Sequence, residues 1–210
     1  MNCHLIGNEI EPSLVALTEI SLLLATPAHH RRTLIESNLF ESRAPLKRWF
    51  GKVDYILANP PFSLPLQAAP DKGGLFALGY RTSDAVFLDV CFELLRPSGR
   101  LACLLPHSLI VNAEYQRLRA AVEARWQLRG VITLPEGVFH LTARTTTRAD
   151  ILILDKPATR SASGSHRTVF ADAPTVGVPL NRRMKDRSNQ LAEIVARADV
   201  REVLGLREEA

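Results

Sequence analysis

The sequence predicts an α/β protein with a doubly wound, mostly parallel sheet. Short apolar runs alternate with longer segments of helical spacing from the start of the chain to about residue 155, and this alternation is typical of strand-helix-strand units. Proline ends three of the apolar runs, at Pro60, Pro106 and Pro157. Because proline lacks the amide that a strand ladder needs, each run is expected to stop there as a short buried strand.

Each element follows from a local pattern. Strands are expected at residues 3–6, 33–36, 53–58, 101–105, 128–134 and 151–154, and helices at 12–25, 83–95 and 114–126. Ser83 stands where the second helix needs an N-cap, and the sequence from Pro97 to Gly99 ends that helix. Four leucines of the first helix are expected to face a core: Leu14, Leu17, Leu22 and Leu24.

The chain divides near residue 157. Residues 158–167 are small, polar and basic, as expected of a loop or linker. A further strand at 168–171 and a short helix at 189–198 follow, and residues 201–210 are expected to fray or to form a docking helix. Residues 1–157 are therefore interpreted as one domain and residues 158–210 as a C-terminal extension.

Composition excludes several classes of protein. The chain has 210 residues, of which 46% are hydrophobic, so it is a globular chain of one domain or one domain with a short appendage. It contains no uncharged apolar stretch of about 18 residues and no secretory signal at its start, so no membrane span and a cytoplasmic location are expected. Cys3, Cys91 and Cys103 are widely spaced among apolar residues and are interpreted as reduced, buried thiols, without a metal site.

Basic residues gather in the second half of the chain. The net charge is only +4, but a segment of 24 residues contains Arg144, Arg148, Lys156, Arg160 and Arg167. Clustered arginine suits a polyphosphate partner, because neutralising phosphates releases counterions. This favours nucleic acid, with Arg144 and Arg148 as candidate DNA contacts. A solvated basic surface is the alternative.

The sequence Asn59-Pro60-Pro61-Phe62 carries the chemistry. It follows directly after the apolar run at 53–58, and ligands of open α/β sheets bind outside the carboxyl ends of the strands. The Asn59 side-chain oxygen and the Pro60 carbonyl can accept the two hydrogens of an exocyclic amine and direct its lone pair toward an incoming methyl group. The two prolines restrict this backbone, and Phe62 offers a flat face to a base rotated out of the helix. A plain turn is the alternative.

At this point the sequence resembles a known family. Residues 5–25, the strand with the Asn59–Phe62 motif, and residues 79–109 and 134–157 together are similar to the N6-adenine DNA methyltransferases, most of all to the modification subunits of Type I restriction-modification systems. The resemblance implies S-adenosylmethionine as the cofactor and a Rossmann-like fold with helices on both faces of a seven-stranded sheet.

The resemblance also assigns residues. Glu9 matches the acidic residue that binds the ribose hydroxyls of the cofactor, and Glu11 is a weaker candidate for the same role. Asn38 falls near the position of an aspartate that contacts the cofactor adenine. Phe139 matches an aromatic residue that stacks on the other face of the flipped base.

One part of the family pattern is not found. The first strand and the glycine-rich cofactor loop should precede Leu5, only four residues do, and no G-x-G sequence occurs elsewhere. That strand would lie between the strand ending near Gly7 and the strand at Val53, so those two strands are expected to have unpaired edges. The sheet is therefore predicted to be incomplete at its N-terminal side, as in an N-terminally truncated domain.

The resulting expectation is adenine N6 methylation of DNA, with a specificity subunit and also a restriction subunit as partners. One alternative is a catalytically inactive remnant or subunit that keeps the DNA-binding face. A further alternative keeps the chemistry and changes the acceptor to an RNA adenine or a protein glutamine amide, because both present similar planar amines.

Overall fold

The computed structural model describes residues 3–67, 74–140, 145–159, 166–177 and 188–206. Its strands are β1 (His4–Glu9), β2 (Arg31–Glu36), β3 (Val53–Ala58), β4 (Leu95–Pro106), β5 (Gln127–Thr133), β6 (Ala149–Asp155) and β7 (Val169–Asp172). Its helices are α1 (Pro12–Ala25), η1 (Ala44–Trp49), α2 (Gly74–Ala77), α3 (Ser83–Leu94), α4 (His107–Val111), η2 (Ala113–Tyr115), α5 (Gln116–Glu123), α7 (Gln190–Ala196) and α8 (Ala198–Leu204).

The main sheet has five strands in the order β3-β4-β6-β5-β7. β6 runs antiparallel to both of its neighbours, whereas β3 pairs with β4, and β5 with β7, in parallel. The α/β class and the mostly parallel sheet are thus confirmed, with β6 as the reversed strand. The carboxyl ends of β3, β4 and β5 consequently lie along one edge of the sheet, which β6 enters from the same side.

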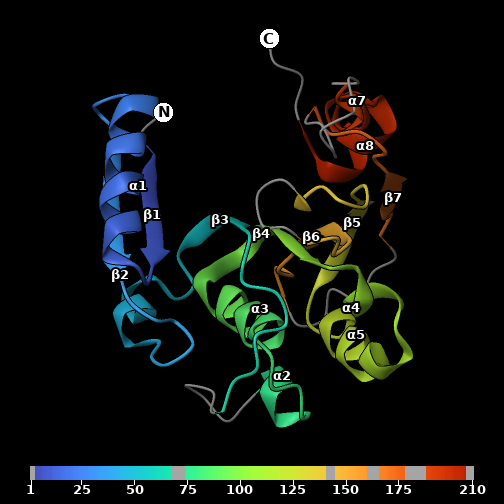
Figure 1. The fold of residues 1–210 in the computed structure, drawn as a ribbon, viewed down its shortest axis with the longest axis horizontal. Helices are drawn as coiled ribbons and strands as arrows, with labels where there is room; N and C mark the ends of the chain where they lie inside the picture. Colours follow the sequence, from blue (N-terminus) through green and yellow to red (C-terminus); the bar gives the residue numbers. More distant parts are fainter. Residues whose placement is uncertain (1–2, 68–73, 141–144, 160–165, 178–187, 207–210) are drawn as a thin grey trace.

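A separate unit at the start of the chain consists of α1 and the parallel pair β1-β2. It lies at one side of the molecule, beside β3 and away from α7 and α8, which pack near β5 and β7 (Figure 1). Among the described residues, β1 pairs only with β2, and β3 pairs only with β4. Each therefore keeps one open edge, as expected. The expectation that residues 53–58 form a buried strand is wrong, because no residue of β3 is buried and Tyr55 and Leu57 are 73% and 85% exposed at the uncovered side of the sheet.

Helix α1 has the predicted bounds but not the predicted environment. None of its residues is buried, and Leu14, Leu17 and Leu24 are 46%, 58% and 84% exposed. The expectation that its leucines face a core is wrong for these three. The helix is apolar on several sides, so its spacing does not single out one face, and the elements that pack against it are the two strands β1 and β2.

Two smaller predictions are also corrected. The N-cap of α3 is Thr82, and Ser83 is the first helical residue, with its hydroxyl directed to a neighbouring loop. All three cysteines are free, but only Cys91 and Cys103 are buried. Cys3 is exposed because it precedes β1 at the rim of the small sheet, outside the hydrophobic clusters of the described residues.

The hydrophobic core lies on both faces of the main sheet. One cluster joins α3 and α5 to β4, β5 and β6, and includes Leu88, Trp126 and Leu154. A second joins β5 and β6 to α7 and α8 through Ile132, Ile153 and Val200. Residues beyond 157 therefore contribute a strand to the main sheet and helices to its second core. Within the described ranges, no helix combines the length and the apolar character needed to cross a membrane.

Candidate functional site

A cavity of about 500 Å³ lies between the small sheet and β3. Its wall is formed by the end of β1, the segment after β2, the strand β3 with the residues that follow it, and one side of α3. Five residues singled out from the sequence line this one cavity: Glu9, Asn38, Asn59, Pro60 and Pro61. They come together because β1, β2 and β3 all end at this cavity, so that the last residue of a strand or the residues after it line the wall.

The Asn59–Phe62 motif begins one residue after β3 ends at Ala58. Asn59 and Pro61 are exposed, Pro60 is buried and Phe62 is half-buried. Ser63 then adopts a positive φ of 50°, an uncommon conformation for a residue other than glycine. The motif therefore crosses the sheet edge as a short bent segment, with Asn59 at the cavity and Phe62 beyond it.

The first turn of α3 holds this bent segment in place. The Ser83 hydroxyl donates to the Pro61 carbonyl at 2.6 Å and accepts from the Leu64 amide at 3.1 Å. The Asp84 Oδ2 atom accepts from the Ser63 amide at 2.9 Å. Ser83 and Asp84 are 0% and 1% exposed, and burial raises the pKa of the Asp84 carboxyl.

Phe62 and Phe139 form an aromatic pair on the side of the motif away from β3. Their ring centroids are 5.8 Å apart and their planes meet at 84°. The contact joins the loop after β3 to the loop after β5, although β4 and β6 separate these strands in the sheet. An edge-to-face pair of this kind offers apolar surface beside the exposed Asn59.

Glu9 and Asn38 form the opposite wall of the cavity. The Glu9 carboxylate accepts from the amides of Ile10 at 2.7 Å and Glu11 at 3.1 Å, and the Asn38 Oδ1 atom accepts from the Phe40 amide at 3.0 Å. Glu11 is exposed, and its carboxylate accepts from the Ser13 hydroxyl at the start of α1. Of the two candidate glutamates, Glu9 is the one that lines the cavity.

Of the two arginines predicted to contact DNA, the structure describes Arg148. Arg144 lies outside the described residues. Arg148 is exposed just before β6, with an Nη2 atom 3.5 Å from a carboxylate oxygen of Asp172. Its carbonyl accepts from the His107 amide, so Arg148 lies at the same sheet edge as the loops after β4 and β5.

A buried carboxylate organises the middle of that edge. Asp150 is fully buried and accepts from the Thr133 hydroxyl at 2.6 Å, while its other oxygen lies 2.8 Å from the His107 Nδ1 atom. Thr133 ends β5, Asp150 lies at the start of β6, and His107 begins α4 directly after β4. The network ties the ends of three neighbouring strands together, and the His107 side chain is 26% exposed above it.

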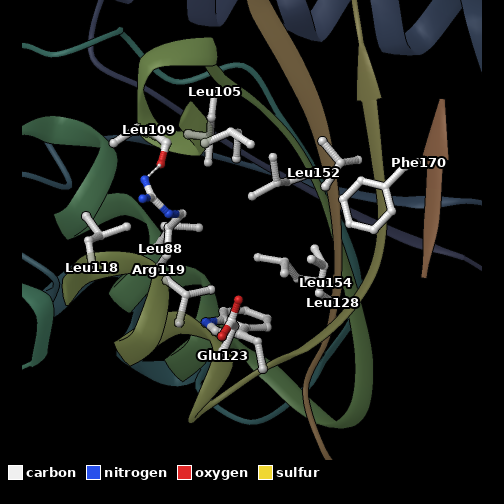
Figure 2. A pocket seen from close by; sticks show the side chains of 14 residues that line it. Leu88, Leu105, Leu109, Leu118, Arg119, Glu123, Leu128, Leu152, Leu154 and Phe170 are labelled. Atoms are coloured by element: carbon white, nitrogen blue, oxygen red, sulfur yellow. Dashed lines mark hydrogen bonds between the residues drawn. The ribbon is translucent and has the colours of Figure 1, made fainter. Parts of the chain in front are cut away.

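A second cavity, of about 220 Å³, lies between the main sheet and the helices α4 and α5. Figure 2 shows leucine side chains around it, with Arg119, Glu123 and Phe170 also at its wall. The Arg119 guanidinium donates to the carbonyls of Leu109 and Asn112 at 3.0 and 2.8 Å, so it fastens α4 to α5. Apart from Arg119 and Glu123 the wall of this cavity is apolar, and the residues predicted to bind the amine and the cofactor line the first cavity instead.

Sequence reasoning missed Ser83, Asp84, His107 and Asp150 as parts of this edge. A signal for Ser83 and Asp84 exists, since a Thr-Ser-Asp sequence opens a largely apolar helix, but a serine at a helix start equally indicates an N-cap. Asp150 also stands alone as a charge at the start of a strand whose next four residues are apolar. A charged residue in that setting is rarely buried without a partner, and the partner is what the sequence does not reveal.

Comparison with known proteins identifies similar chains. The sequence profile of the family described as N-6 DNA Methylase matches residues 1–199. The methylase subunit of the Type I restriction enzyme EcoEI from Escherichia coli is 27% identical over 113 residues, which is 53% of this chain and 23% of that subunit. The chain therefore aligns with less than a quarter of the length of that curated relative.

Solved structures share the fold at low identity. A Listeria monocytogenes protein assigned to the class I S-adenosylmethionine-dependent methyltransferases gives a TM-score of 0.61 at 18% identity, over 95% of this chain and 55% of that one. A Vibrio vulnificus YJ016 protein assigned as a Type I modification subunit gives 0.59 at 18% identity, over 98% of this chain and 41% of that one. At such identities the likeness concerns the arrangement of strands and helices.

Proposed function

This chain belongs to the N-6 DNA methylase family, and from that premise we propose that it takes part in methyl transfer from S-adenosylmethionine to the N6 nitrogen of adenine in DNA. The observation that carries the proposal is the shared cavity: Asn59 and Pro60 line it together with Glu9 and Asn38. Groups suited to an exocyclic amine thus lie across one space from groups suited to an adenosyl cofactor.

In the proposed reaction the chain's own residues bind and orient the amine. The Asn59 side-chain oxygen and the Pro60 carbonyl accept the two N6 hydrogens, which draws the nitrogen toward tetrahedral geometry and directs its lone pair across the cavity. Phe62 and Phe139 hold the base by contact with its faces or edge, in place of the neighbouring bases that it leaves. Fixing these groups before the reaction supplies much of the rate increase, because less orientational freedom is lost at the transition state.

The residues of the cavity fit the adenosyl part of the cofactor. A carboxylate at Glu9 suits two adjacent ribose hydroxyls, the Asn38 amide suits an adenine edge, and apolar side chains such as Ile10 and Leu39 complete the wall. When bound, S-adenosylmethionine supplies an electrophilic methyl group on a sulfonium. No strong general base is needed for attack on such a group, and none is assigned.

Partners follow from the same proposal. The relative from Escherichia coli is a subunit of a Type I restriction enzyme, and we propose that this chain likewise works with a specificity subunit that selects the DNA sequence and with a restriction subunit. Exposed Arg148, at the sheet edge, is a candidate phosphate contact. Arg144 remains a candidate on sequence grounds alone.

The test is identification of the methylated product. The chain, with and without the specificity subunit of a Type I system from the same source, is incubated with plasmid DNA and S-adenosylmethionine labelled in its methyl group. Nucleoside analysis by mass spectrometry is expected to find N6-methyladenine. Label that enters RNA or a protein glutamine amide under matched conditions, but not DNA, would refute the proposed acceptor.

A second candidate function has an observation of its own. Among the described residues that line the cavity there is no lysine or arginine to meet the carboxylate of the cofactor, and the open edges of β1 and β3 both border this space. These features favour a subunit that keeps the DNA-facing edge but does not hold the cofactor alone. Calorimetry separates the candidates, because heat of binding on titration with S-adenosylmethionine contradicts the second.

A further inference from the structure

We propose that Ser83 and Asp84 are positioning residues that hold the loop carrying Asn59 and Phe62 in its reactive geometry. The inference deepens the proposed function and rests on it for its catalytic part. Neither residue contacts the space where the amine would lie. Both act through the backbone of residues 61–64, which follows the two acceptor groups directly.

The contacts are specific to the backbone of this loop. The Ser83 hydroxyl donates to the Pro61 carbonyl at 2.6 Å and accepts from the Leu64 amide at 3.1 Å. The Ser83 amide in turn donates to the Leu64 carbonyl at 2.9 Å. The Ser63 amide also donates to the Asp84 carboxylate. Four hydrogen bonds in all therefore join Ser83 and Asp84 to the backbone of residues 61–64.

The loop needs such support, because burial does not hold it. Pro61, Ser63 and Leu64 are all exposed, and Ser63 has a φ of 50° in the left-handed region. A residue other than glycine persists in that conformation only when its surroundings determine it. Hydrogen bonds from a buried helix end are the determining contacts here, and they fix the peptide plane that leads into Phe62.

The supporting side chains are themselves rigid. Ser83 and Asp84 are 0% and 1% exposed on a helix that packs into the main core. A carboxylate withdrawn from water is costly unless it is hydrogen-bonded, which agrees with the raised pKa of Asp84. Its acceptor oxygen is directed at the Ser63 amide, so the buried charge is coupled to the conformation of the loop.

The same helix offers a matched control. Asp89 is 4% exposed, accepts from the Leu75 amide at 2.7 Å and pairs with Arg125. It is therefore a second buried aspartate of α3 that accepts a backbone amide, but its partners lie in α2 and after α5. Removing its carboxylate should perturb packing without moving the loop that follows β3.

The experiment compares Ser83→Ala, Asp84→Ala, Asp84→Asn and Asp89→Ala in the full chain. Hydrogen exchange of the Ser63 and Leu64 amides is followed by NMR, together with the kcat and KM of DNA methylation. We expect exchange at Leu64 in Ser83→Ala, and at Ser63 in Asp84→Ala, to rise by about fivefold or more, the equivalent of one net hydrogen bond. The kcat of both should fall by about 100-fold, with little change in KM, because the reacting groups are displaced and not removed.

The remaining variants complete the test. Asp84→Asn keeps an oxygen that can accept from the Ser63 amide, so it should restore protection and most of kcat. Asp89→Ala should lower stability while leaving exchange at Ser63 and Leu64, and kcat, as in the wild type. If Asp84→Ala does not fold, Ser83→Ala carries the test, since it removes a single hydroxyl.

Two failures are distinguishable. Unchanged exchange at Ser63 and Leu64 in folded Ser83→Ala and Asp84→Ala, or an unchanged kcat in those variants, overturns the positioning role. A wild-type chain that protects both amides but methylates no DNA under any combination of partners refutes the proposed function, and with it the catalytic part of this inference. In that case, faster exchange of the two amides in Ser83→Ala and Asp84→Ala still establishes that these residues support the loop.

Discussion

The rings of Phe62 and Phe139 meet edge to face with their centroids 5.8 Å apart, although 77 residues separate them in the chain. This contact brings the loop after β3 to the loop after β5 across two intervening strands. It gives the exposed Asn59 an aromatic neighbourhood that neither loop supplies alone.

Replacement of Phe139 by leucine should weaken the capture of a flipped base. Stacking on an aromatic side chain contributes about 1–3 kcal/mol per base, so we expect a loss of roughly 5- to 150-fold in the equilibrium for base extrusion. The measurement is the fluorescence of 2-aminopurine at the target position of a DNA duplex. Phe170→Leu is the control, because Phe170 is 71% exposed on β7 at the other cavity. Equal effects of both substitutions would contradict the assignment.

Replacement of Asn59 by alanine should abolish methyl transfer and leave the fold intact. Asn59 is exposed, so the free energy of unfolding should change by less than about 0.5 kcal/mol. Loss of an oriented acceptor should lower kcat by about 100- to 1,000-fold. Asn112→Ala, an exposed asparagine after α4, is the control. Full activity of Asn59→Ala would remove this residue from the mechanism.

Replacement of Glu9 by glutamine should weaken cofactor binding more than the same change at Glu11. A hydrogen bond to a charged group contributes about 1.5–3 kcal/mol, so we expect a Kd for S-adenosylmethionine that is at least about tenfold higher in Glu9→Gln. Isothermal titration calorimetry measures both variants. A larger effect at Glu11 would transfer the ribose contact to that residue.

The pH dependence of stability should carry a signature of Asp84. Burial raises the pKa of this carboxyl above its ordinary value of 3.8. The folded state therefore binds the proton more tightly than the unfolded state, so the stability that this group contributes is present below pH 3.8 and is lost as pH rises through the raised value. Urea unfolding at a series of pH values should show the wild type losing stability relative to Asp84→Asn over that window. The opposite trend would show that hydrogen bonds to the carboxylate outweigh its desolvation.

The thiols should differ in reactivity. Cys3 is exposed, whereas Cys91 and Cys103 are buried and burial raises the pKa of both thiols well above the ordinary value. Because the thiolate is the reactive species, a disulfide reagent such as Ellman's should titrate one thiol in the native chain and three after unfolding. A Cys3→Ser variant with no rapidly reacting thiol is the control. Rapid reaction of two or three native thiols would contradict the described burial.

Local patterns predicted the elements whose signals are local. Residues 12–25 and 53–58 form α1 and β3 with the bounds expected from the sequence, because helical spacing and a proline stop act within a few residues. β4 begins at Leu95, earlier than expected, because its first part pairs with β3 through a register shift after Val53. Cross-strand pairing of this kind leaves no mark in the sequence of either strand.

Part of the candidate site is likewise predictable from local sequence, and part depends on distant segments. The Asn59–Phe62 motif was evident from its two prolines after an apolar run, and Glu9 and Asn38 were assigned only through resemblance. The support that Ser83 and Asp84 give to the motif is not predicted by the sequence, because it depends on a loop 19 to 22 residues earlier in the chain. The role of Asp150 likewise depends on Thr133 and His107, which reach it from the end of β5 and the start of α4.

Strand and helix periods and proline stops specify an α/β chain with an Asn-Pro-Pro-Phe motif after an apolar strand, because they are properties of neighbouring residues. Tertiary structure decided that β6 runs against its neighbours, that α1 leaves its leucines exposed and that Phe139 meets Phe62. It also decided that α3 supports the motif through Ser83 and Asp84. The physical reason is that burial and hydrogen-bond partnership depend on which distant segments pack together, and no local pattern specifies that choice.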